Sequence, residues 1–198
     1  MTSTCMTEDT STETWGVETV VGRRPVTYNR RAPMPILDER TLEFHSHSAE
    51  QTERLGVRLG ELLQPGDLIC LAGDLGAGKT VFTRGIARGW GSLDPVTSPT
   101  FVLINEYRRG DDSRLSHIDA FRIGGAREAL DLGLRELLDD PGPVVVEWPE
   151  RLAEAIPSQR LWIQLAWVED SRRHLRLEAS GPRYERLLRD YRQAAFGG

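Results

Sequence analysis

The sequence predicts an α/β fold of three layers, in which helices cover a central, largely parallel sheet that carries an antiparallel hairpin at one edge. The first observation behind this prediction is that apolar strands alternate with amphipathic helices through the middle of the chain. The second is that two strand patterns near the C-terminal end are separated only by residues 169–171. A chain of 198 residues, 39% of them hydrophobic, suits one domain with its own core.

Composition and charge exclude several classes of protein. The net charge of −5 argues against a strongly basic surface that would bind nucleic acid tightly and unaided. Cys5 and Cys70 do not make a disulfide framework, which fits a reducing compartment. Residues 1–14 lack the apolar core of a secretory signal, and no apolar stretch approaches the roughly 18 residues of a membrane span. We therefore expect a cytoplasmic protein without a membrane segment.

The start of the chain does not share the pattern of the predicted fold. Residues 1–40 are polar, show little periodicity and include Pro25, Pro33 and Pro35. We expect them to form a disordered or loosely docked extension. The predicted domain spans residues 41–198.

Each element of the domain carries a local signal. Ser48 followed by Gln51 is typical of a helix start with a capping box, and Pro65 ends that helix. Residues 143–147 are apolar up to a final acid, as in a strand buried on both faces. In chain order we expect a strand at 42–44, a helix from 48, a strand at 67–72, a helix ending near 90, strands at 101–107 and 115–119, a helix at 126–138, a strand at 143–147, strands at 161–168 and 174–179, and a helix at about 183–196.

The loop after the strand at 67–72 matches the pattern G-x-x-x-x-G-K-[ST] of a Walker A phosphate loop. Its residues are Gly73, Asp74, Leu75, Gly76, Ala77, Gly78, Lys79 and Thr80. Glycines let such a loop wrap an anion with its amides, and the helix that follows presents its positive end to phosphate. In this pattern the lysine reaches the β- and γ-phosphates and the Thr hydroxyl binds Mg²⁺. The sequence therefore predicts a nucleotide site that uses ATP or GTP with Mg²⁺.

The lysine count favours ATP. Of the 25 basic residues, only Lys79 is lysine, and it stands in the phosphate loop. An Asn-Lys-x-Asp guanine-recognition motif needs a lysine of its own. The shortage itself is explained by arginine replacing lysine on exposed faces, whereas arginine's planar fork does not replace a compact ammonium beside phosphate.

A phosphate-loop enzyme also needs an acid near the metal, at the end of a neighbouring strand. Asp119 and Glu147 both end predicted strands, and we expect at least one of them to be functional. The alternative for each is a carboxylate that faces solvent or caps the next helix. Residues 97–101, Thr-Ser-Pro-Thr-Phe, suit a loop that closes on the γ-phosphate through a hydroxyl. Taken alone, that segment reads better as a turn before a strand.

Four motifs in order carry a resemblance to a known family. They are Gly-Asp-Leu-Gly-Ala-Gly-Lys-Thr at 73–80, Thr-Ser-Pro-Thr-Phe at 97–101, His-Ile-Asp-Ala-Phe-Arg at 117–122 and Val-Glu-Trp-Pro-Glu at 146–150. Over residues 41–180 the chain resembles the TsaE (YjeE) family of small bacterial ATPases required for threonylcarbamoyladenosine formation in tRNA. The resemblance implies a P-loop NTPase-like fold and ATP hydrolysis in complex with TsaB and TsaD. Those partners carry the transfer onto adenosine 37, so this chain would meet tRNA only through the complex.

The resemblance also implies roles for single residues. It makes Thr80 and Glu147 the Mg²⁺ ligands, while Lys79 and the loop amides hold the phosphates. It puts Asp119 at a switch-like acidic position and Thr100 in a first switch.

Three further positions carry open alternatives. The resemblance implies that Trp148 is needed for activity, either stacked near the nucleotide or as part of a partner surface. It implies that Arg173 contacts the nucleotide, although the neighbouring Arg172 fits the alignment too. Val81 and the pair Ala120-Phe121 depart from the family pattern by lacking a hydroxyl and a phenol, without touching metal or phosphate groups. His117 either orients Asp119 or packs in the core, and the packing role is favoured.

Three functions are compatible with a phosphate loop. The first is an ATPase that drives or resets the tRNA-modifying complex. The second is a nucleotide-gated binding module, in which ATP occupancy controls assembly and slow hydrolysis is incidental. The third, a small-molecule kinase, is disfavoured because residues 97–101 and 147–150 have no role in it.

Overall fold

The computed structural model describes residues 38–96, 104–169 and 171–197. Nearly all of the predicted extension, residues 1–40, lies outside these ranges, as does the segment 97–101 with Thr100. The division of the chain into an extension and a domain therefore stays a prediction.

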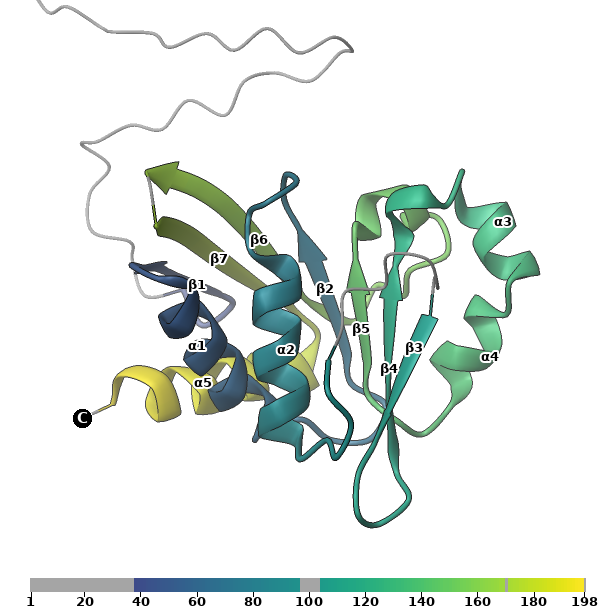
Figure 1. The fold of residues 1–198 in the computed structure, drawn as a ribbon, viewed down its shortest axis with the longest axis horizontal. Coiled ribbons are helices and arrows are strands. Elements are labelled where there is room, and N and C mark those ends of the chain that lie inside the picture. The colour runs from purple at the N-terminus through teal and green to yellow at the C-terminus, as the bar shows by residue number, and fades with distance from the viewer. Residues whose placement is uncertain (1–37, 97–103, 170, 198) are drawn as a thin grey trace, which may run out of the picture. The chain divides into compact units, whose positions relative to one another are not determined.

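Seven strands form one sheet, and helices lie between them in the sequence (Figure 1). The strands are β1 (Thr41–Ser46), β2 (Leu68–Ala72), β3 (Ile104–Arg108), β4 (Arg114–Asp119), β5 (Val144–Glu147), β6 (Arg160–Glu169) and β7 (Arg172–Ser180). The helices are α1 (Ala49–Gly60), α2 (Lys79–Trp90), α3 (Ala126–Asp131), α4 (Leu134–Asp139) and α5 (Pro182–Phe196), with 3₁₀ turns η1 (Ala120–Arg122) and η2 (Pro149–Leu152).

The sheet has the order β1-β7-β6-β2-β5-β4-β3. Its four central strands, β6, β2, β5 and β4, run parallel to one another. The β6–β7 hairpin is antiparallel and adds β1 at one edge, and β3 pairs antiparallel with β4 at the other. The predicted α/β fold with a largely parallel centre and an antiparallel hairpin is confirmed. The antiparallel strand at the second edge follows from the short turn between β3 and β4, which allows no crossover.

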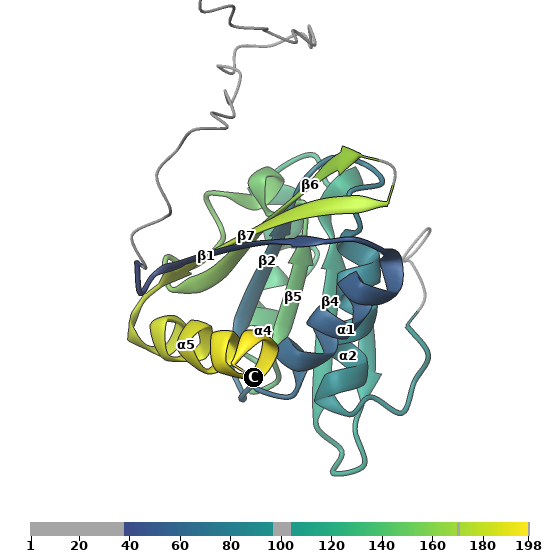
Figure 2. The ribbon, with the colours of Figure 1, turned by 90° about the vertical axis from the view of Figure 1, so that its left-hand side faces the viewer.

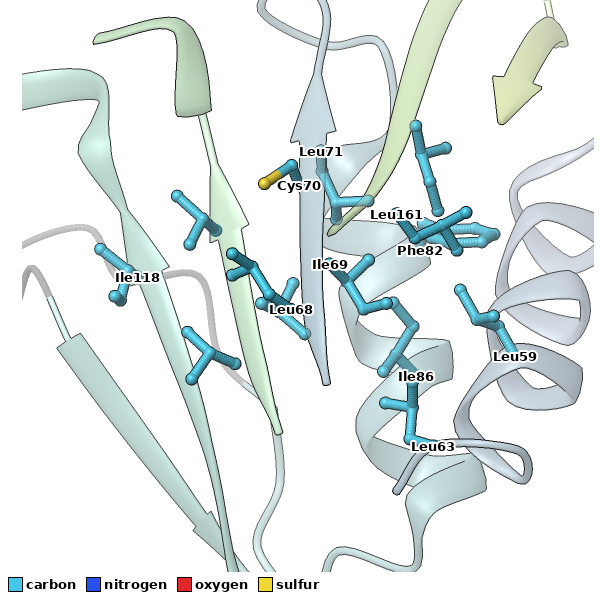
Figure 3. Packing of buried hydrophobic residues seen from close by; sticks show 14 of the residues in the cluster. Leu59, Leu63, Leu68, Ile69, Cys70, Leu71, Phe82, Ile86, Ile118 and Leu161 are labelled. Carbon is cyan, nitrogen blue, oxygen red and sulfur yellow. The ribbon is translucent and has the colours of Figure 1, made fainter. Parts of the chain in front are cut away.

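Side chains of β2 alternate between two helical layers. Ile69 and Leu71 point toward Phe82 of α2, whereas Cys70 points to the other face of the sheet (Figure 3). Ile118 lies in register with Cys70 through β5, and lines an apolar pocket with residues of α3, α4 and η2. Figure 2 shows α1 and α2 side by side on the opposite face. The fully buried strand β2 thus has a helical layer on each side, as expected for a parallel centre.

The helix expected over residues 126–138 is wrong in one respect, because it is two short helices. α3 ends before Leu132, and Gly133 then takes a left-handed conformation with φ of 90° before α4 begins. Residues with an L side chain rarely adopt this φ, so glycine allows the break. The helical spacing of the leucines continues across the break and therefore does not reveal it.

The helices α1 and α2 approach each other so closely that only glycine fits at four positions. A Cβ added at Gly56 would lie 2.4 Å from the Phe82 carbonyl oxygen, and one added at Gly60 would lie 2.1 Å from the Ile86 carbonyl oxygen. On α2, Gly85 and Gly89 face the backbone of α1 at 2.1 and 2.0 Å in the same sense. This close contact holds α2, the helix that follows the phosphate loop, against α1 along its length.

We expect Gly85→Ala to destabilise the fold. In an isolated helix the change would stabilise by about 1 kcal/mol, but here the methyl group meets the Glu53 carbonyl oxygen at 2.1 Å. Overpacking costs about 1–3 kcal/mol, and a clash with a backbone atom lies toward the upper end because that atom cannot rotate away, so we expect a net loss of up to about 2 kcal/mol in urea unfolding. Gly110→Ala is the matched control, since a Cβ there meets nothing within 4 Å. Equal stability of the two variants would contradict the close helix contact.

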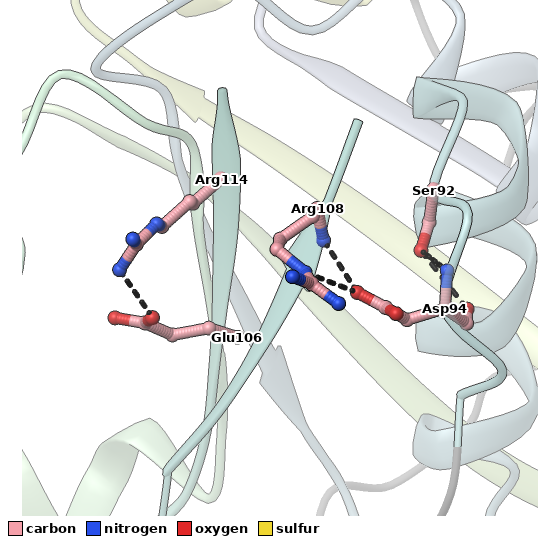
Figure 4. Close-up of polar contacts among 5 residues, drawn as sticks. All are labelled: Ser92, Asp94, Glu106, Arg108 and Arg114. Carbon is pink, nitrogen blue, oxygen red and sulfur yellow. Dashed lines mark hydrogen bonds and ion pairs between the residues drawn. The ribbon is translucent and has the colours of Figure 1, made fainter. Parts of the chain in front are cut away.

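Polar contacts hold the edge strand β3 in place (Figure 4). The Asp94 carboxylate, just after α2, accepts from the Arg108 backbone N–H at 2.9 Å and from its side-chain Nε at 3.4 Å. Across the hairpin, Arg114 donates to Glu106 at 2.9 Å. These contacts flank Tyr107, whose side chain turns into the protein and is 3% exposed.

Candidate phosphate-binding and metal-binding site

The predicted phosphate loop joins the end of β2 to the start of α2. Gly73 has φ of 139°, and a Cβ there would lie 2.1 Å from the Leu165 carbonyl oxygen of β6. Gly76 and Gly78 also have positive φ, of 80° and 103°. The three glycines of the motif are therefore required by backbone conformation and, at Gly73, by space as well.

The helix end and Lys79 supply positive charge at this loop. Gly78 stands at the N-cap of α2 without a side chain of its own to occupy the first amides of the helix. Lys79 Nζ donates to the carbonyl oxygens of Gly73, at 2.6 Å, and Asp74, at 2.8 Å. Burial lowers the pKa of Lys79, and nearby carboxylates, led by Glu147, act in the opposite direction. The ammonium is thus held inside the loop that is predicted to bind phosphate.

Glu147 ends β5 beside the first turn of α2. Its carboxylate is 2% exposed, and Oε2 accepts a hydrogen bond from the Thr80 hydroxyl at 3.1 Å. Oε1 lies 3.1 Å from the Thr83 hydroxyl and 3.0 Å from His117 Nε2. The structure therefore brings Thr80 and Glu147, the two predicted metal ligands, into direct contact.

The pair has the chemistry of a Mg²⁺ site. A hydroxyl and a carboxylate offer hard oxygen ligands, and Mg²⁺ in nucleotide sites takes one or two such protein ligands with phosphates and water. Within the described ranges no cluster of three His, Cys, Asp or Glu side chains is suited to hold a metal. Thr80 and Glu147 thus fit the protein share of a Mg²⁺ site whose other ligands are phosphate and water.

Trp148 lies under Lys79 in an uncommon backbone conformation. Its φ of 59° is left-handed, and the Lys79 ammonium lies 3.8 Å from its ring centroid. The Phe121 ring lies against it at 5.0 Å between centroids. A strained residue at such a position indicates a site that the surrounding fold holds in place.

Asp119 ends β4 in register with Glu147. Its Oδ1 accepts from the Phe121 backbone N–H at 2.9 Å and so caps η1. Burial raises the pKa of Asp119, and the charge of Glu147 adds to the rise. Asp119 thus has the capping role that the sequence left open as an alternative. Its carboxyl group still lies on the residue next to Glu147 in the sheet, the predicted metal ligand.

The geometry separates the two neighbouring arginines. A Cβ at Gly78 would lie 3.6 Å from Arg173 Nε, so Arg173 reaches the phosphate loop. Arg172 instead pairs with Glu169 at 3.8 Å on the hairpin. Of the two arginines, Arg173 is the one beside the phosphate loop.

Sequence reasoning missed Thr83, which contacts Glu147, and Tyr107, which contacts His117. Thr83 was not singled out, although it lies three residues after Thr80 and therefore on the same side of α2. Tyr107 was not singled out either, and no local pattern marks it. His117 is fully buried, in line with the packing role that the sequence favours, and it also hydrogen-bonds Glu147. These residues contact the site from β3, β4 and α2, far apart in the sequence.

Comparison with known proteins identifies the family. The family model described as "Threonylcarbamoyl adenosine biosynthesis protein TsaE" matches residues 46–175. The chain belongs to the TsaE family. The matched range begins at the end of β1, includes the phosphate loop, Asp119 and Glu147, and ends within β7. The resemblance inferred from the four motifs is confirmed.

Relatives within the TsaE family cover most of the described chain. It is 38% identical over 149 residues to the tRNA threonylcarbamoyladenosine biosynthesis protein TsaE of Bacillus subtilis, covering 75% of this chain and 92% of the relative. It is 42% identical over 136 residues to the protein of the same name from Streptomyces coelicolor, covering 66% and 91%. The crystal structure of Bacillus subtilis YdiB matches with a TM-score of 0.66 and 34% identity, covering 77% of this chain and 95% of that chain.

Among the described residues of this TsaE-family chain, helices that combine the length and the apolar character of a membrane span are absent.

Proposed function

We propose that this chain is a Mg²⁺-dependent ATPase that acts in the cytoplasm in the formation of threonylcarbamoyladenosine in tRNA. It works with TsaB- and TsaD-type proteins, which perform the transfer, and reaches tRNA through that complex. The observation that carries the proposal is the meeting of Lys79, Thr80 and Glu147 at one end of the parallel strands. The Thr80 hydroxyl lies 3.1 Å from Glu147, beside the loop that encloses the Lys79 ammonium. TsaE-family membership supplies the pathway.

The loop residues bind the phosphates of ATP. Gly73, Asp74, Leu75, Gly76, Ala77 and Gly78 supply backbone to the loop, and the amides from Leu75 to Thr80 donate to phosphate oxygens. Lys79 exchanges its hydrogen bonds to loop carbonyls for charge-assisted bonds to phosphate. Arg173 adds a second positive charge from β7.

The metal ligands are Thr80 and Glu147. Bound Mg²⁺ neutralises charge on the phosphates and polarises the oxygens to which it binds. The Thr83 hydroxyl and His117 hold the second oxygen of Glu147, so the carboxylate keeps its orientation toward Thr80.

The remaining predicted residues act around the γ-phosphate. Asp119 orients the attacking water, a role that suits a carboxyl fixed by the Phe121 amide and adjacent to Glu147. Thr100 closes on the γ-phosphate through its hydroxyl. Trp148 packs under Lys79 and keeps water from the ammonium. ATP is preferred to GTP, since an Asn-Lys-x-Asp guanine-recognition motif needs a lysine and the one lysine of the chain is in the phosphate loop.

A nucleotide-gated binding module is the second candidate. It is favoured by the bonds of Lys79 to its own loop, because ATP must displace them and thereby couples occupancy to loop conformation. In that case ATP binding alone would control assembly with the partners.

We expect Asp119→Asn to separate the two candidates. The variant keeps the shape that caps η1 and should bind ATP, but it loses the charge that orients water and stops turnover. Reconstituted with TsaB- and TsaD-type proteins and tRNA, it should fail to support modification over many cycles. Sustained modification by this variant, with ATP hydrolysis absent, would favour the gated module over the ATPase.

A further inference from the structure

A chain of buried hydrogen bonds runs from the edge strand β3 to Glu147. His117 Nε2 lies 3.0 Å from Glu147 Oε1, and His117 Nδ1 lies 3.2 Å from the Tyr107 hydroxyl. The Asn105 side chain hydrogen-bonds Tyr107 in turn. His117 is completely buried, and Tyr107 and Glu147 are 3% and 2% exposed. Polar groups so deeply buried impose their hydrogen-bond directions on one another.

The acceptors fix the direction of this chain. A carboxylate oxygen only accepts, so the proton on His117 lies on Nε2 and points at Glu147. In the neutral ring Nδ1 then accepts, and the Tyr107 hydroxyl is the donor that faces it. Each member thus has one role that satisfies its neighbours.

We propose that His117 is a positioning residue for Glu147, and that Tyr107 acts through His117 by fixing its tautomer. The part of this proposal that concerns the orientation of Glu147 toward the metal rests on the proposed function. With Oε1 held by His117 and Thr83, rotation of the carboxylate is blocked and Oε2 stays directed at Thr80. The conformation of the edge strand is thereby linked to the metal ligand.

The anchoring of β3 supports this role. Tyr107 is flanked by Glu106, which pairs with Arg114, and by Arg108, which pairs with Asp94 after α2 (Figure 4). The Tyr107 and His117 rings are stacked, with centroids 6.1 Å apart and planes at 29°. A phenol on a strand held at both sides aims its hydroxyl in one direction, as a tautomer-setting group must.

The first experiment reads the tautomer in the free chain. Nitrogen-15 NMR of the full chain without nucleotide or metal should find the His117 proton on Nε2, with Nδ1 as a hydrogen-bonded acceptor. Tyr107→Phe should shift the Nδ1 resonance while the fold is kept. A proton on Nδ1 with a bare Nε2 would overturn the proposal. This readout does not depend on ATP or Mg²⁺, so it stands even if the proposed function fails.

The second experiment reads the metal. We expect His117→Leu to raise the Mg²⁺ concentration needed for half-maximal enhancement of ATP binding about 10- to 100-fold. This is the usual loss of metal affinity when a group that orients a metal ligand is removed. ATP binding in EDTA should stay unchanged. His117→Gln, which offers an amide N–H where Nε2–H stands, should recover part of the loss. A purely structural His117 would lower the thermal midpoint of both variants alike and leave the Mg²⁺ dependence equal to wild type, which would overturn the proposal.

Tyr107→Phe keeps the metal test decisive if His117→Leu does not fold. It removes one oxygen and should raise the Mg²⁺ concentration needed for half-maximal enhancement of ATP binding severalfold. Unchanged Mg²⁺ dependence in a folded Tyr107→Phe chain would remove Tyr107 from the account. Failure of the wild-type chain to bind Mg²⁺–ATP at all would instead count against the proposed function, and the NMR result would still decide the role of His117.

Discussion

The Lys79→Ala variant should bind ATP about 10- to 150-fold more weakly than the wild-type chain, since a hydrogen bond to a charged group contributes about 1.5–3 kcal/mol and each 1.4 kcal/mol is tenfold. The structure adds a reason to expect the upper part of this range. The ammonium lies in a partly dry environment between loop carbonyls and the Trp148 ring, where a charge acts strongly. Isothermal titration of ATP, with and without Mg²⁺, measures the change.

Two controls separate this effect from a general loss of positive charge. Arg88→Ala removes a charge from the same helix, where Arg88 is mostly exposed and pairs with Glu53 at 3.5 Å, and should leave ATP binding unchanged. Lys79→Arg keeps the charge but replaces a compact ammonium with a planar fork, so it should bind poorly as well. ATP binding by Lys79→Ala at wild-type strength would remove the phosphate-loop assignment.

Glu147→Gln should leave ATP binding in EDTA intact while lowering Mg²⁺-dependent turnover at least about 100-fold, because loss of an orienting partner alone costs up to about that much and here the metal ligand itself changes. The amide keeps the shape of the carboxylate but removes its charge from the contact with Thr80. It also meets His117 Nε2–H with either an amide oxygen or an amide N–H, which disturbs the chain behind it. Steady-state ATP hydrolysis at varied Mg²⁺ is the measurement.

The matched control is Glu61→Gln. This glutamate lies at the surface after α1, where it pairs with the exposed Arg58 at 3.3 Å, and its charge has no connection to the site. Turnover of Glu61→Gln should equal that of the wild-type chain. If Glu147→Gln hydrolyses ATP as fast as Glu61→Gln, Glu147 is not a metal ligand.

The features predicted well from the sequence are those written in short, contiguous patterns. The phosphate loop between an apolar strand and a helix requires glycines at conformations that few other residues adopt. A short stretch of sequence with Gly73, Gly76 and Gly78 is therefore enough to predict it. The buried strands β2 and β5 are predicted by unbroken apolar runs. The acids Asp119 and Glu147 stand out because each ends a strand, β4 and β5 respectively. The strand patterns alone left Asp119 and Glu147 as equal candidates for the acid near the metal, and it was the family resemblance that paired Glu147 with Thr80, the contact that the structure has.

The features that were missed depend on residues brought together by the tertiary fold. Tyr107, His117 and Glu147 lie on three different strands, and no spacing in the chain marks their hydrogen bonds. The close contact of α1 with α2 depends on glycines in both helices, each of which looks unfavourable in its own helix.

Backbone conformation explains the remaining differences. Trp148 takes a left-handed φ that its own propensity disfavours, so its place under Lys79 could not be predicted from the sequence, which left open whether it stacks near the nucleotide or forms part of a partner surface. At Gly133 a helical pattern of leucines continues through a break in the helix, and the period alone indicates one helix.

ATP hydrolysis by the wild-type chain, measured alone and with TsaB- and TsaD-type proteins, tests the central claim most directly. Phosphate-loop proteins hydrolyse slowly when a partner is needed to complete the site, so we expect low, Mg²⁺-dependent activity from the chain alone. The two partners together should raise it, and Lys79→Ala should abolish the rise. Mg²⁺-dependent hydrolysis that is absent both alone and with the partners would contradict the account.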